Sequence, residues 1–404
     1  MKFTEKTLEE INKVYAKKNP STYLNDYKKI KTFTNNRKNF LHKLKLPSRI
    51  FKNSTLIDFG CGSGQNTIVY NILGSNTTLV EYDKQSIKNT VNLFKKFSKS
   101  KYKIIKSDIF KYKSNKKYDF VVSNGVIHHT KDPKKNIDIC CKYLKKGGFF
   151  ILGWGEVYGF FQRNIQRIIL YSISQNRDEI IKYSKILFRD HLLRSVKFSG
   201  RKIDEIIFDT YINPKINAVS LDEIVNLLSK NGLDLYSSYE PLTKLINFSK
   251  QTHDQFRLVG NKKISKKNRK KGEIFLNNFY NFSLSSQQNN KNRNLSHYSK
   301  MSFFLKKIVD KTNDVNFFQT RKKLPISEVI SLKKILLKTK KEEIIDINHN
   351  FVFLKELNVI FKILESKKEK IKKFKEIRKL LNKSKKILKG KNGVGMNYIV
   401  GYKR

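Results

Sequence analysis

An acid and three glycines stand close together near residue 60, in a spacing that suits a small ligand. Residues 56–64 read LIDFGCGSG, an apolar run that leads into a glycine loop. Glycine permits a positive φ and lets a ligand approach the backbone. A dinucleotide loop, G-x-G-x-x-G, would need its last glycine at position 65, which is Gln65. Because Asp58 precedes the loop, the pattern favours a cationic or amino-bearing ligand over a pyrophosphate.

Two further acids also lie at or just after the ends of predicted strands. Glu81 ends the second predicted strand, and Asp108 comes just after the third. The carboxyl ends of parallel strands meet at one edge of the sheet, where open α/β sheets bind their ligands. There Glu81 is placed to accept two ribose hydroxyls, Asp108 to accept an exocyclic amine of adenine, and Asp58 to face an α-amino group. Each of these acids alone could be an ordinary surface or capping residue, but three acids at successive strand ends favour a shared binding site.

The elements that must position these acids alternate in the chain. From residue 54 onward, strands and helices take turns, which is typical of a parallel sheet covered on both faces. Residues 1–50 are predicted to form a helical segment before this core. Strands are predicted at residues 56–59, 77–82, 102–106, 118–123, 149–154 and 233–239, with helices between them.

Residues 54–154 resemble a class I S-adenosylmethionine-dependent methyltransferase. The segments that carry the resemblance are LIDFGCGSG, LVEYD and KSDIF, followed by YDFVVSNGVIHHTKDP and YLKKGGFFILG, and they lie close to the branch that contains quinone-biosynthesis methyltransferases. The resemblance implies an α/β, Rossmann-like fold with a seven-stranded, mainly parallel sheet of order 3-2-1-4-5-7-6. It also implies S-adenosyl-L-methionine as the cofactor.

The resemblance also assigns the site residues. Asp58 and the glycine loop would hold the methionine part, Glu81 the ribose, and Asp108 the adenine. Tyr82 and Ile109 would sandwich the adenine ring, and the segment 123–125 would line the sulfonium side. The complete set implied to bind the cofactor is Asp58, Gly60, Cys61, Gly62, Gly64, Glu81, Tyr82, Asp108, Ile109, Asn124 and Gly125.

His128 and His129 are the candidates for a catalytic base. They follow the fourth predicted strand directly, and histidine is the usual base near neutral pH. The alternative is a structural role, in which one of them hydrogen-bonds a neighbouring loop carbonyl. Glu156, just past the fifth strand, is the next candidate. A sulfonium methyl is already activated, so a methyltransferase needs alignment more than it needs a strong base.

Residues 155–219 interrupt the predicted core and are expected to form a helical substrate lid. Two helices are predicted there, over residues 160–174 and 177–194. Its cations could hold an anionic substrate, or they could simply form a solvated face. These residues are Arg163, Arg167, Arg189, His191 and Arg194.

Residues 220–242 are predicted to complete the core with a helix and the sixth strand. The chain after them is rich in Lys. Residues 243–392 are expected to form a helical insertion or extension, and residues 393–404 the last core strand. Residues 256–260 are a rival for that last strand, in which case the tail would be a separate domain.

The composition does not decide whether the protein binds RNA, an anionic membrane surface or neither. The net charge of +51 favours RNA or an anionic membrane surface, but a chain with many Lys and two alanines also reflects an AT-rich coding sequence. The three cysteines lack a metal-binding spacing, so no metal is expected, and they suggest a reducing cytoplasm. Neither a signal peptide nor a membrane span is predicted.

The sequence therefore predicts a cytoplasmic methyltransferase that acts on a small molecule, or on a cell-envelope or quinone-type intermediate. An RNA methyltransferase whose Lys-rich region contacts phosphates is the alternative. A third interpretation, a binding protein that keeps the fold without activity, is disfavoured by the intact set of three acids.

Overall fold

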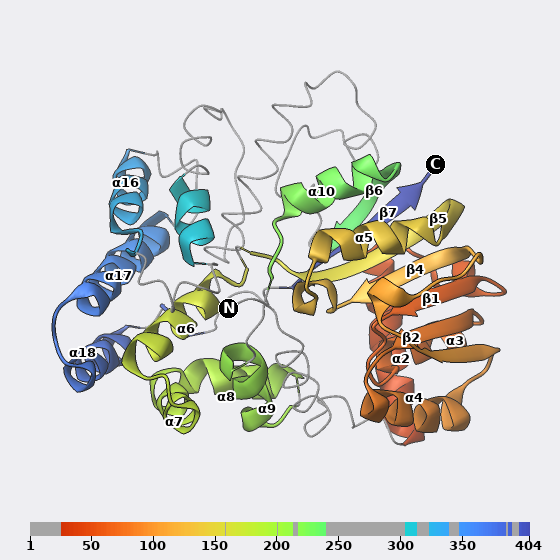
Figure 1. The fold of residues 1–404 in the computed structure, drawn as a ribbon, viewed down its shortest axis with the longest axis horizontal. Helices are drawn as coiled ribbons and strands as arrows, with labels where there is room; N and C mark the ends of the chain where they lie inside the picture. The colour runs from red at the N-terminus through yellow and green to blue at the C-terminus, as the bar shows by residue number, and fades with distance from the viewer. Residues whose placement is uncertain are drawn as a thin grey trace.

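A seven-stranded sheet lies on the right-hand side of the protein in Figure 1. The computed structural model describes residues 26–157, 159–199, 201–212, 217–239, 304–312, 323–338, 347–384, 387–389 and 396–404. The strand order is β3-β2-β1-β4-β5-β7-β6, as expected. The strands are β1 (Thr55–Phe59), β2 (Asn76–Glu81), β3 (Tyr102–Lys106), β4 (Tyr118–Asn124), β5 (Leu144–Gly155), β6 (Leu233–Tyr239) and β7 (Met396–Lys403). Strands β1 to β5 are parallel, and β7 runs antiparallel to both of its neighbours.

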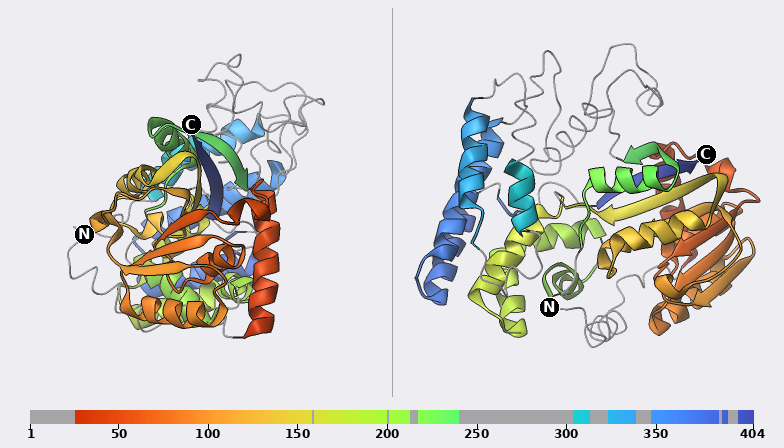
Figure 2. Two further views of the ribbon diagram at one scale, coloured as in Figure 1. Left: turned by 90° about the vertical axis from the view of Figure 1, so that its right-hand side faces the viewer. Right: turned by 45° about the horizontal axis from the view of Figure 1, so that its top comes forward.

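Helices cover both faces of the sheet because successive strand residues point to opposite sides. In β1, Leu56 packs against α2 (Tyr27–Lys43) and α3 (Gln65–Ile72), whereas Ile57 packs against α5 (Pro133–Lys142). Helix α4 (Lys84–Phe97) shares the α2 and α3 side, and α10 (Leu221–Lys230) shares the α5 side. Figure 2 shows α2 and α5 on opposite sides of the strands.

Local sequence explains where these helices begin. Asp83 caps α4 by accepting the N–H of Ser86 at 2.7 Å, and Ser220 caps α10 in a capping box. Asp132 caps α5, whose first residue is Pro133. The helices that link the strands therefore start directly after the strand ends that carry the candidate site.

Strand β7, at the end of the chain, lies between β5 and β6. Its Val400 pairs with Ile151, and its Gly401 pairs with both Phe150 and Leu235. The rival strand at residues 256–260 lies outside the described residues, as does most of the predicted N-terminal helix before residue 26. The seventh place in the sheet belongs to Met396–Lys403, while the segment boundaries predicted from the sequence stay a prediction.

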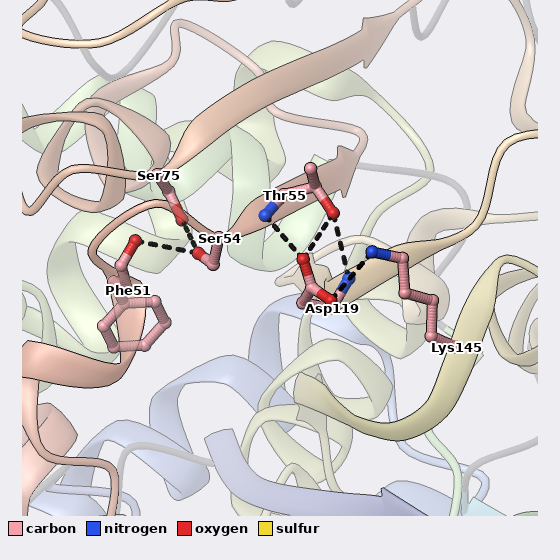
Figure 3. A network of polar contacts seen from close by, with 6 residues as sticks. All are labelled: Phe51, Ser54, Thr55, Ser75, Asp119 and Lys145. Atoms are coloured by element: carbon pink, nitrogen blue, oxygen red, sulfur yellow. Dashed lines mark hydrogen bonds and ion pairs between the residues drawn. The ribbon is translucent and has the colours of Figure 1, made fainter.

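A polar network joins the amino ends of the central strands (Figure 3). The Asp119 carboxylate accepts the N–H and the hydroxyl of Thr55 at 2.8 and 2.6 Å, and Lys145 donates to its other oxygen at 2.9 Å. Beside it, the hydroxyls of Ser54 and Ser75 contact each other. These contacts fix β1 against β4 and β5 at the edge opposite the candidate site.

The remaining helices form a second hydrophobic core. Phe161 in the lid segment, Leu305, and Leu357 near the end of the chain belong to one buried cluster that is separate from those of the sheet. Its elements are α6 (Phe161–Ile173), α7 (Arg177–Leu187), α8 (Arg189–Ser199), α9 (Ile203–Ile207), the π-helix η4 (Phe208–Ile212), the helical segment 304–312, α16 (Ile326–Leu337), α17 (Ile347–Glu365) and α18 (Lys370–Lys383). We call this unit the helical body; Figure 1 shows α16, α17 and α18 beside α6, away from the sheet.

The lid segment differs in detail from its prediction. The single helix expected at residues 177–194 is broken at Phe188, whose backbone leaves the helical region (φ −119°, ψ 27°) while its ring is buried. The chain after it, over residues 203–212, forms α9 and the π-helix. Across the described residues, no helix is both long and apolar enough to cross a membrane.

We expect Asp119→Ala to lower the free energy of unfolding by about 1–3 kcal/mol, because the backbone N–H and the hydroxyl of Thr55 both lose their acceptor. Lys145→Met, which removes only a half-exposed ion pair, should cost less than about 1 kcal/mol. Urea denaturation of both variants measures the difference. Equal losses would show that the network does not depend on the Thr55 contacts.

Candidate functional site

The carboxyl ends of β1 to β4 bring the predicted acids to one edge of the sheet. Asp58 lies beside Val122 of β4, and Phe59 beside Val80, so that Glu81 ends the next strand along. Glu81 in turn pairs with Lys106, two residues before Asp108. The sequence-predicted residues of β1, β2 and β3 therefore line one crevice edge, as the parallel topology requires.

The glycine loop is held by the end of β2. The N–H groups of Gly60 and Cys61 donate to the Val80 carbonyl at 2.8 and 3.3 Å. On the α4 side, the Thr90 hydroxyl donates to the Gly62 carbonyl at 2.8 Å. The loop is thus fixed from two elements before any ligand is considered.

The three glycines of the loop share a positive φ but differ in the space around them. All three have positive φ: +75° at Gly60, +56° at Gly62 and +75° at Gly64. A Cβ at Gly60 would lie 2.7 Å from the Val126 side chain, and one at Gly64 would lie 2.9 Å from Thr90. A Cβ at Gly62 would meet nothing within 4 Å. Gly60 and Gly64 therefore allow neighbouring side chains to pack closely against the loop, whereas Gly62 borders open space that a ligand can approach.

Backbone donors hold the Glu81 carboxyl group in place. Its Oε2 accepts the Gly62 N–H at 2.8 Å, and its Oε1 accepts those of Tyr82 and Asp83 at 2.8 and 3.0 Å. A carboxylate oxygen that has accepted one hydrogen bond keeps acceptor capacity. Glu81 thus links the glycine loop to β2 and still has lone pairs for a hydroxyl-bearing ligand.

Asp108 caps the short helix η2 (Ile109–Lys111) with one oxygen. Its Oδ1 accepts the Phe110 N–H at 2.9 Å, and the Ser107 N–H bonds the Glu81 carbonyl at 3.0 Å. Tyr82 is 55% exposed, and Ile109 is partly buried. Tyr82 follows the end of β2 directly, and Ile109 lies three residues beyond the end of β3, the neighbouring strand.

Asp58 is the buried acid of the set. It is 2% exposed, its Oδ2 accepts the Thr67 hydroxyl, and its Oδ1 has no hydrogen-bond partner among the described residues. Burial raises the pKa of Asp58 to about 7, a rise that Thr67 opposes and the negative Glu81 reinforces. A cationic group delivered to Oδ1 would be stabilised by this carboxylate more strongly than in water.

Asn124 and Gly125 end β4 on the other side of the loop. The Gly125 N–H donates to the Gly153 carbonyl at 2.8 Å, and its φ is +79°. A Cβ at Gly153 would collide with the Asn124 Oδ1 and the Tyr398 ring. Side chains of β4 and the terminal strand β7 therefore pack against β5 at this point.

The two histidines form the short helix η3 (Ile127–His129) and differ in environment. The Gly155 N–H donates to Nδ1 of His128 at 3.0 Å, so the proton of the neutral ring sits on Nε2. Burial lowers the pKa of His128 well below its usual value, with smaller effects from His129 and Arg163. His128 is buried against Phe160, whereas His129 is only partly buried. The occupied Nδ1 disfavours proton uptake by His128, so His129 is the better placed of the two candidates.

Asn217, which lies between the π-helix and α10, contacts the core next to these histidines. The Asn217 N–H donates to the His128 carbonyl at 2.7 Å, and its side-chain amide donates to the Thr130 carbonyl at 2.9 Å. Glu156 forms an isolated bridge with Val219, and its Oε2 accepts the Gly159 N–H at 2.9 Å. Glu156 is fully buried and holds the start of the lid segment.

The lid cations occupy unequal positions. Arg189 and Arg194 are exposed, and Arg167 is buried. His191 bonds the buried Gln166 at 2.9 Å, and burial lowers the pKa of His191 to about 3. Arg163 lies over the Phe160 ring at 4.9 Å from its centre, close to His128. Of the five predicted cations, Arg163 is the one beside the predicted base.

Asp209 is a neighbour of this group that the sequence analysis did not assign. It lies on the π-helix and pairs with Arg201 at 3.1 Å. Burial raises the pKa of Asp209, but Arg201, His129 and Arg163 outweigh it and hold the pKa below its usual value. A π-helix inserted in a chain often marks a functional site. Asp209 thus brings a negative charge from the helical body toward His129.

Other supporting residues were also missed. Thr67 and Thr90 hold Asp58 and the loop, and Asn217 holds η3. Their signals in the sequence are weak, because a helical threonine or a loop asparagine has many ordinary roles. Within the described ranges, we find no group of three His, Cys, Asp or Glu side chains that could hold a metal ion.

A sequence model of the family described as methyltransferase domain matches residues 33–238, half of the chain. A comparison with curated proteins found no match.

Solved structures of methyltransferases are also similar, at low identity. PKMT2 from Rickettsia typhi in complex with AdoHcy is 17% identical, with a TM-score of 0.44, over 61% of this chain and 50% of that one. An S-adenosylmethionine-dependent methyltransferase from Clostridium acetobutylicum ATCC 824 is 22% identical, with a TM-score of 0.28, over 38% and 60%. Magnesium protoporphyrin IX methyltransferase from Synechocystis PCC 6803 is 12% identical, with a TM-score of 0.32, over 51% and 74%. The chain thus spans less than two thirds of the Rickettsia and Clostridium proteins.

The raised pKa of Asp58 predicts a pH dependence of stability. Its folded pKa of about 7 exceeds the ordinary 3.8, so its contribution to stability is present below about pH 4 and is lost as the pH rises through 7. The full change amounts to about 4 kcal/mol, while Asp58→Asn keeps an acceptor for Thr67 and does not titrate. We therefore expect wild type to lose stability relative to Asp58→Asn between pH 4 and 8.

Chemical denaturation at several pH values measures this difference. Asp119→Asn is the matched control, because the pKa of Asp119 is lowered and its stabilising contribution is instead lost as the pH falls. Parallel stability curves for wild type and Asp58→Asn would contradict the assignment of a buried, ionisable Asp58.

Proposed function

Because the chain belongs to the methyltransferase-domain family, with the class I strand order, we propose that it transfers a methyl group from S-adenosylmethionine to a small-molecule acceptor bound beneath the helical body. The observation that carries the proposal is the convergence of Asp58, Glu81 and Asp108 on one crevice edge around the glycine loop. An acceptor related to cell-envelope or quinone intermediates is the finer form of the proposal.

The residues at the edge fit this cofactor. The buried Oδ1 of Asp58, which has no partner among the described residues, suits the ammonium of the methionine part. The open space beside Gly62 lets the ligand approach the loop backbone. Glu81 suits the ribose hydroxyls because backbone donors fix its carboxylate in place. Asp108 suits the adenine amine through Oδ2, because only its Oδ1 caps η2.

Further residues would complete the cofactor site. Gly60, Cys61 and Gly64 would contribute through the backbone of the loop. Tyr82 and Ile109 would enclose the adenine ring, while Asn124 and Gly125 would line the sulfonium side. The positive φ at Gly125 and its tie to Gly153 support a close approach at this point.

When bound, the cofactor supplies a methyl group that its sulfonium already activates. The protein's own task is to align an acceptor and to exclude water, and alignment alone can lower the barrier by about 7–11 kcal/mol. The β4 end supports alignment because Asn217 fixes η3 by two hydrogen bonds. Phe160, packed on His128, provides an apolar surface at the same place.

His129 is the proposed base, and it would accept the proton that the acceptor loses. Its neighbour His128 has Nδ1 occupied by the Gly155 N–H, which supports a positioning role for His128. The carboxylate of Asp209 favours a positive charge on His129, as a base must carry after proton uptake. Arg163 lies beside the pair and is the proposed contact for a negative group on the acceptor.

The segment that leads from the π-helix to α10 supports a small acceptor because it lies beside η3. In this segment the Asn217 N–H donates to the His128 carbonyl at 2.7 Å, and the Val219 carbonyl accepts the Trp154 Nε1–H at 2.9 Å. A folded RNA would have to reach the same place past these contacts. The alternative is an RNA acceptor that the Lys-rich region binds. It predicts that RNA receives the transferred methyl group, and that the affinity for RNA falls steeply as the salt concentration rises.

We expect Glu81→Ala to weaken binding of S-adenosylmethionine about 10- to 100-fold, because two ribose hydroxyls lose a charged acceptor and the loop loses its tie at Gly62. Isothermal titration calorimetry measures the affinity. Asp234→Ala, which removes an acid on β6 paired with the exposed Arg404, is the control and should bind as wild type does. If Glu81→Ala bound S-adenosylmethionine as tightly as wild type does, the assignment of this cofactor would be wrong.

The proposed base predicts a division between the two histidines. With methyl-labelled cofactor and a cell extract, His129→Ala should lower label transfer about 10²- to 10⁴-fold. His129→Ala should still bind the cofactor normally by calorimetry. His128→Gln should retain more activity, because it can restore an acceptor for the Gly155 N–H.

Fractionation of the labelled extract identifies the acceptor class. Label in the low-molecular-weight or lipid fraction supports the proposal, whereas label in RNA supports the alternative. Full transfer by His129→Ala would remove His129 as the base without affecting the methyltransferase assignment.

A further inference from the structure

Arg163 is a cation without a direct ionic partner among the described residues. It lies in the first turn of α6, with its Cζ 4.9 Å from the centre of the Phe160 ring. Neither a hydrogen bond nor an ion pair joins its guanidinium to another residue that the structure describes. Burial lowers the pKa of Arg163, yet part of its surface is exposed. The guanidinium is therefore surrounded by protein and still open to a molecule that enters beside it.

Arg163 stands close to the proposed base. The Phe160 ring that it contacts packs edge-on against His128 with ring centroids 5.6 Å apart, and the rings of His128 and His129 lie 4.1 Å apart. The charge of Arg163 also acts on Tyr211 of the π-helix. The guanidinium thus lies a short distance from the group that would take the proton of the acceptor.

The charges around Arg163 do not balance. The charged groups that act on it are Arg201 and Asp209. These two pair with each other, since Nη1 of Arg201 lies 3.1 Å from the Asp209 carboxylate, while Nη2 of Arg201 donates to the Glu205 carbonyl at 3.3 Å. With the nearby histidines neutral, two guanidinium groups share one carboxylate, and one positive charge is in excess. Because an uncompensated charge inside a protein is costly, this excess favours a ligand with one negative charge.

The guanidinium of Arg163 suits a carboxylate better than a phosphate. A planar guanidinium donates two parallel hydrogen bonds to the two oxygens of a carboxylate. A carboxylate also brings one negative charge, which equals the excess, whereas a phosphate monoester carries about −1.5 to −2 at pH 7. We propose that the methyl acceptor is a small organic acid whose carboxylate binds Arg163. This inference rests on the proposed function and deepens it, because it names the chemical class of the acceptor.

The carboxylate is the anchor of the acceptor and not its methylated group. A carboxylate is already deprotonated at neutral pH and needs no base. The proposed base, His129, instead takes a proton from a second group of the acceptor, and that group receives the methyl. The bond from sulfur to the methyl breaks as the new bond forms, and S-adenosylhomocysteine leaves. A contact between Arg163 and the far end of the acceptor supports the alignment that this transfer requires.

The test uses methyl-labelled S-adenosylmethionine and a small-molecule and lipid extract of cells. Anion exchange at neutral pH divides the extract into an acidic fraction and a fraction without anions. Wild type should label the acidic fraction. Amidation of its carboxylates with a carbodiimide and an amine should abolish the labelling, whereas phosphatase treatment should leave the labelling unchanged. The product should keep its label in mild alkali, which hydrolyses methyl esters.

Variants of Arg163 test the contact itself. Arg163→Met should raise the apparent KM for the acidic fraction about 10- to 100-fold, as expected for the loss of a charge-assisted contact. Arg163→Lys should lie between Arg163→Met and wild type, because it keeps the charge but not the planar fork. Both variants should bind S-adenosylhomocysteine as wild type does, by calorimetry. Lys182→Met removes an exposed cation of α7 and should match wild type in both measurements.

The outcomes separate the acceptor class from the activity. Label in the fraction without anions, transfer that survives amidation, or transfer that phosphatase abolishes would overturn the carboxylate and leave the methyltransferase assignment standing. Label that alkali releases, or an unchanged apparent KM in Arg163→Met, would overturn the role of Arg163 as an anchor. If wild type labels no fraction of the extract, the proposed function fails, and the inference fails with it. If Arg163→Met does not fold, the comparison of untreated and amidated fractions with wild type decides the question.

Discussion

The whole architecture depends on the antiparallel insertion of the last strand between β5 and β6. Strand β7 satisfies the backbone groups of both neighbours, because it pairs with Phe149 to Gly155 on one side and with Leu233 to Tyr239 on the other. Its Tyr398 also contributes to the wall beside Asn124 and Phe40. The sheet and its crevice are thus complete only when the end of the chain has returned to the core. Contacts between such distant segments are slow to form in folding.

Much of this fold could be predicted from the sequence, because its signals are local. Strand ends, glycine turns and caps such as Asp83 and Ser220 lie within a few residues of the elements that they define. The resemblance then supplied the strand order, which the structure confirms. The break at Phe188 and the π-helix could not be predicted, because they follow from packing between the lid segment and helices far along the chain.

The site divides along the same line. The positions of Asp58, Glu81 and Asp108 follow from the parallel topology, so the sequence could bring them together on one edge. The unequal states of the two histidines could not be inferred, because they depend on a backbone donor from Gly155 and on a charge from the helical body. Polar groups that gain meaning from tertiary contacts leave no spacing to recognise.

The shared hydrophobic core of the helical body has a consequence for truncation. Phe161 and Phe353 lie on opposite sides of β6 in the sequence, yet their rings pack in one cluster with centroids 6.4 Å apart. The helices before and after β6 therefore bury one common apolar surface. Removal of either set of helices would expose the apolar side chains of the other to water, so the two sets stand or fall together.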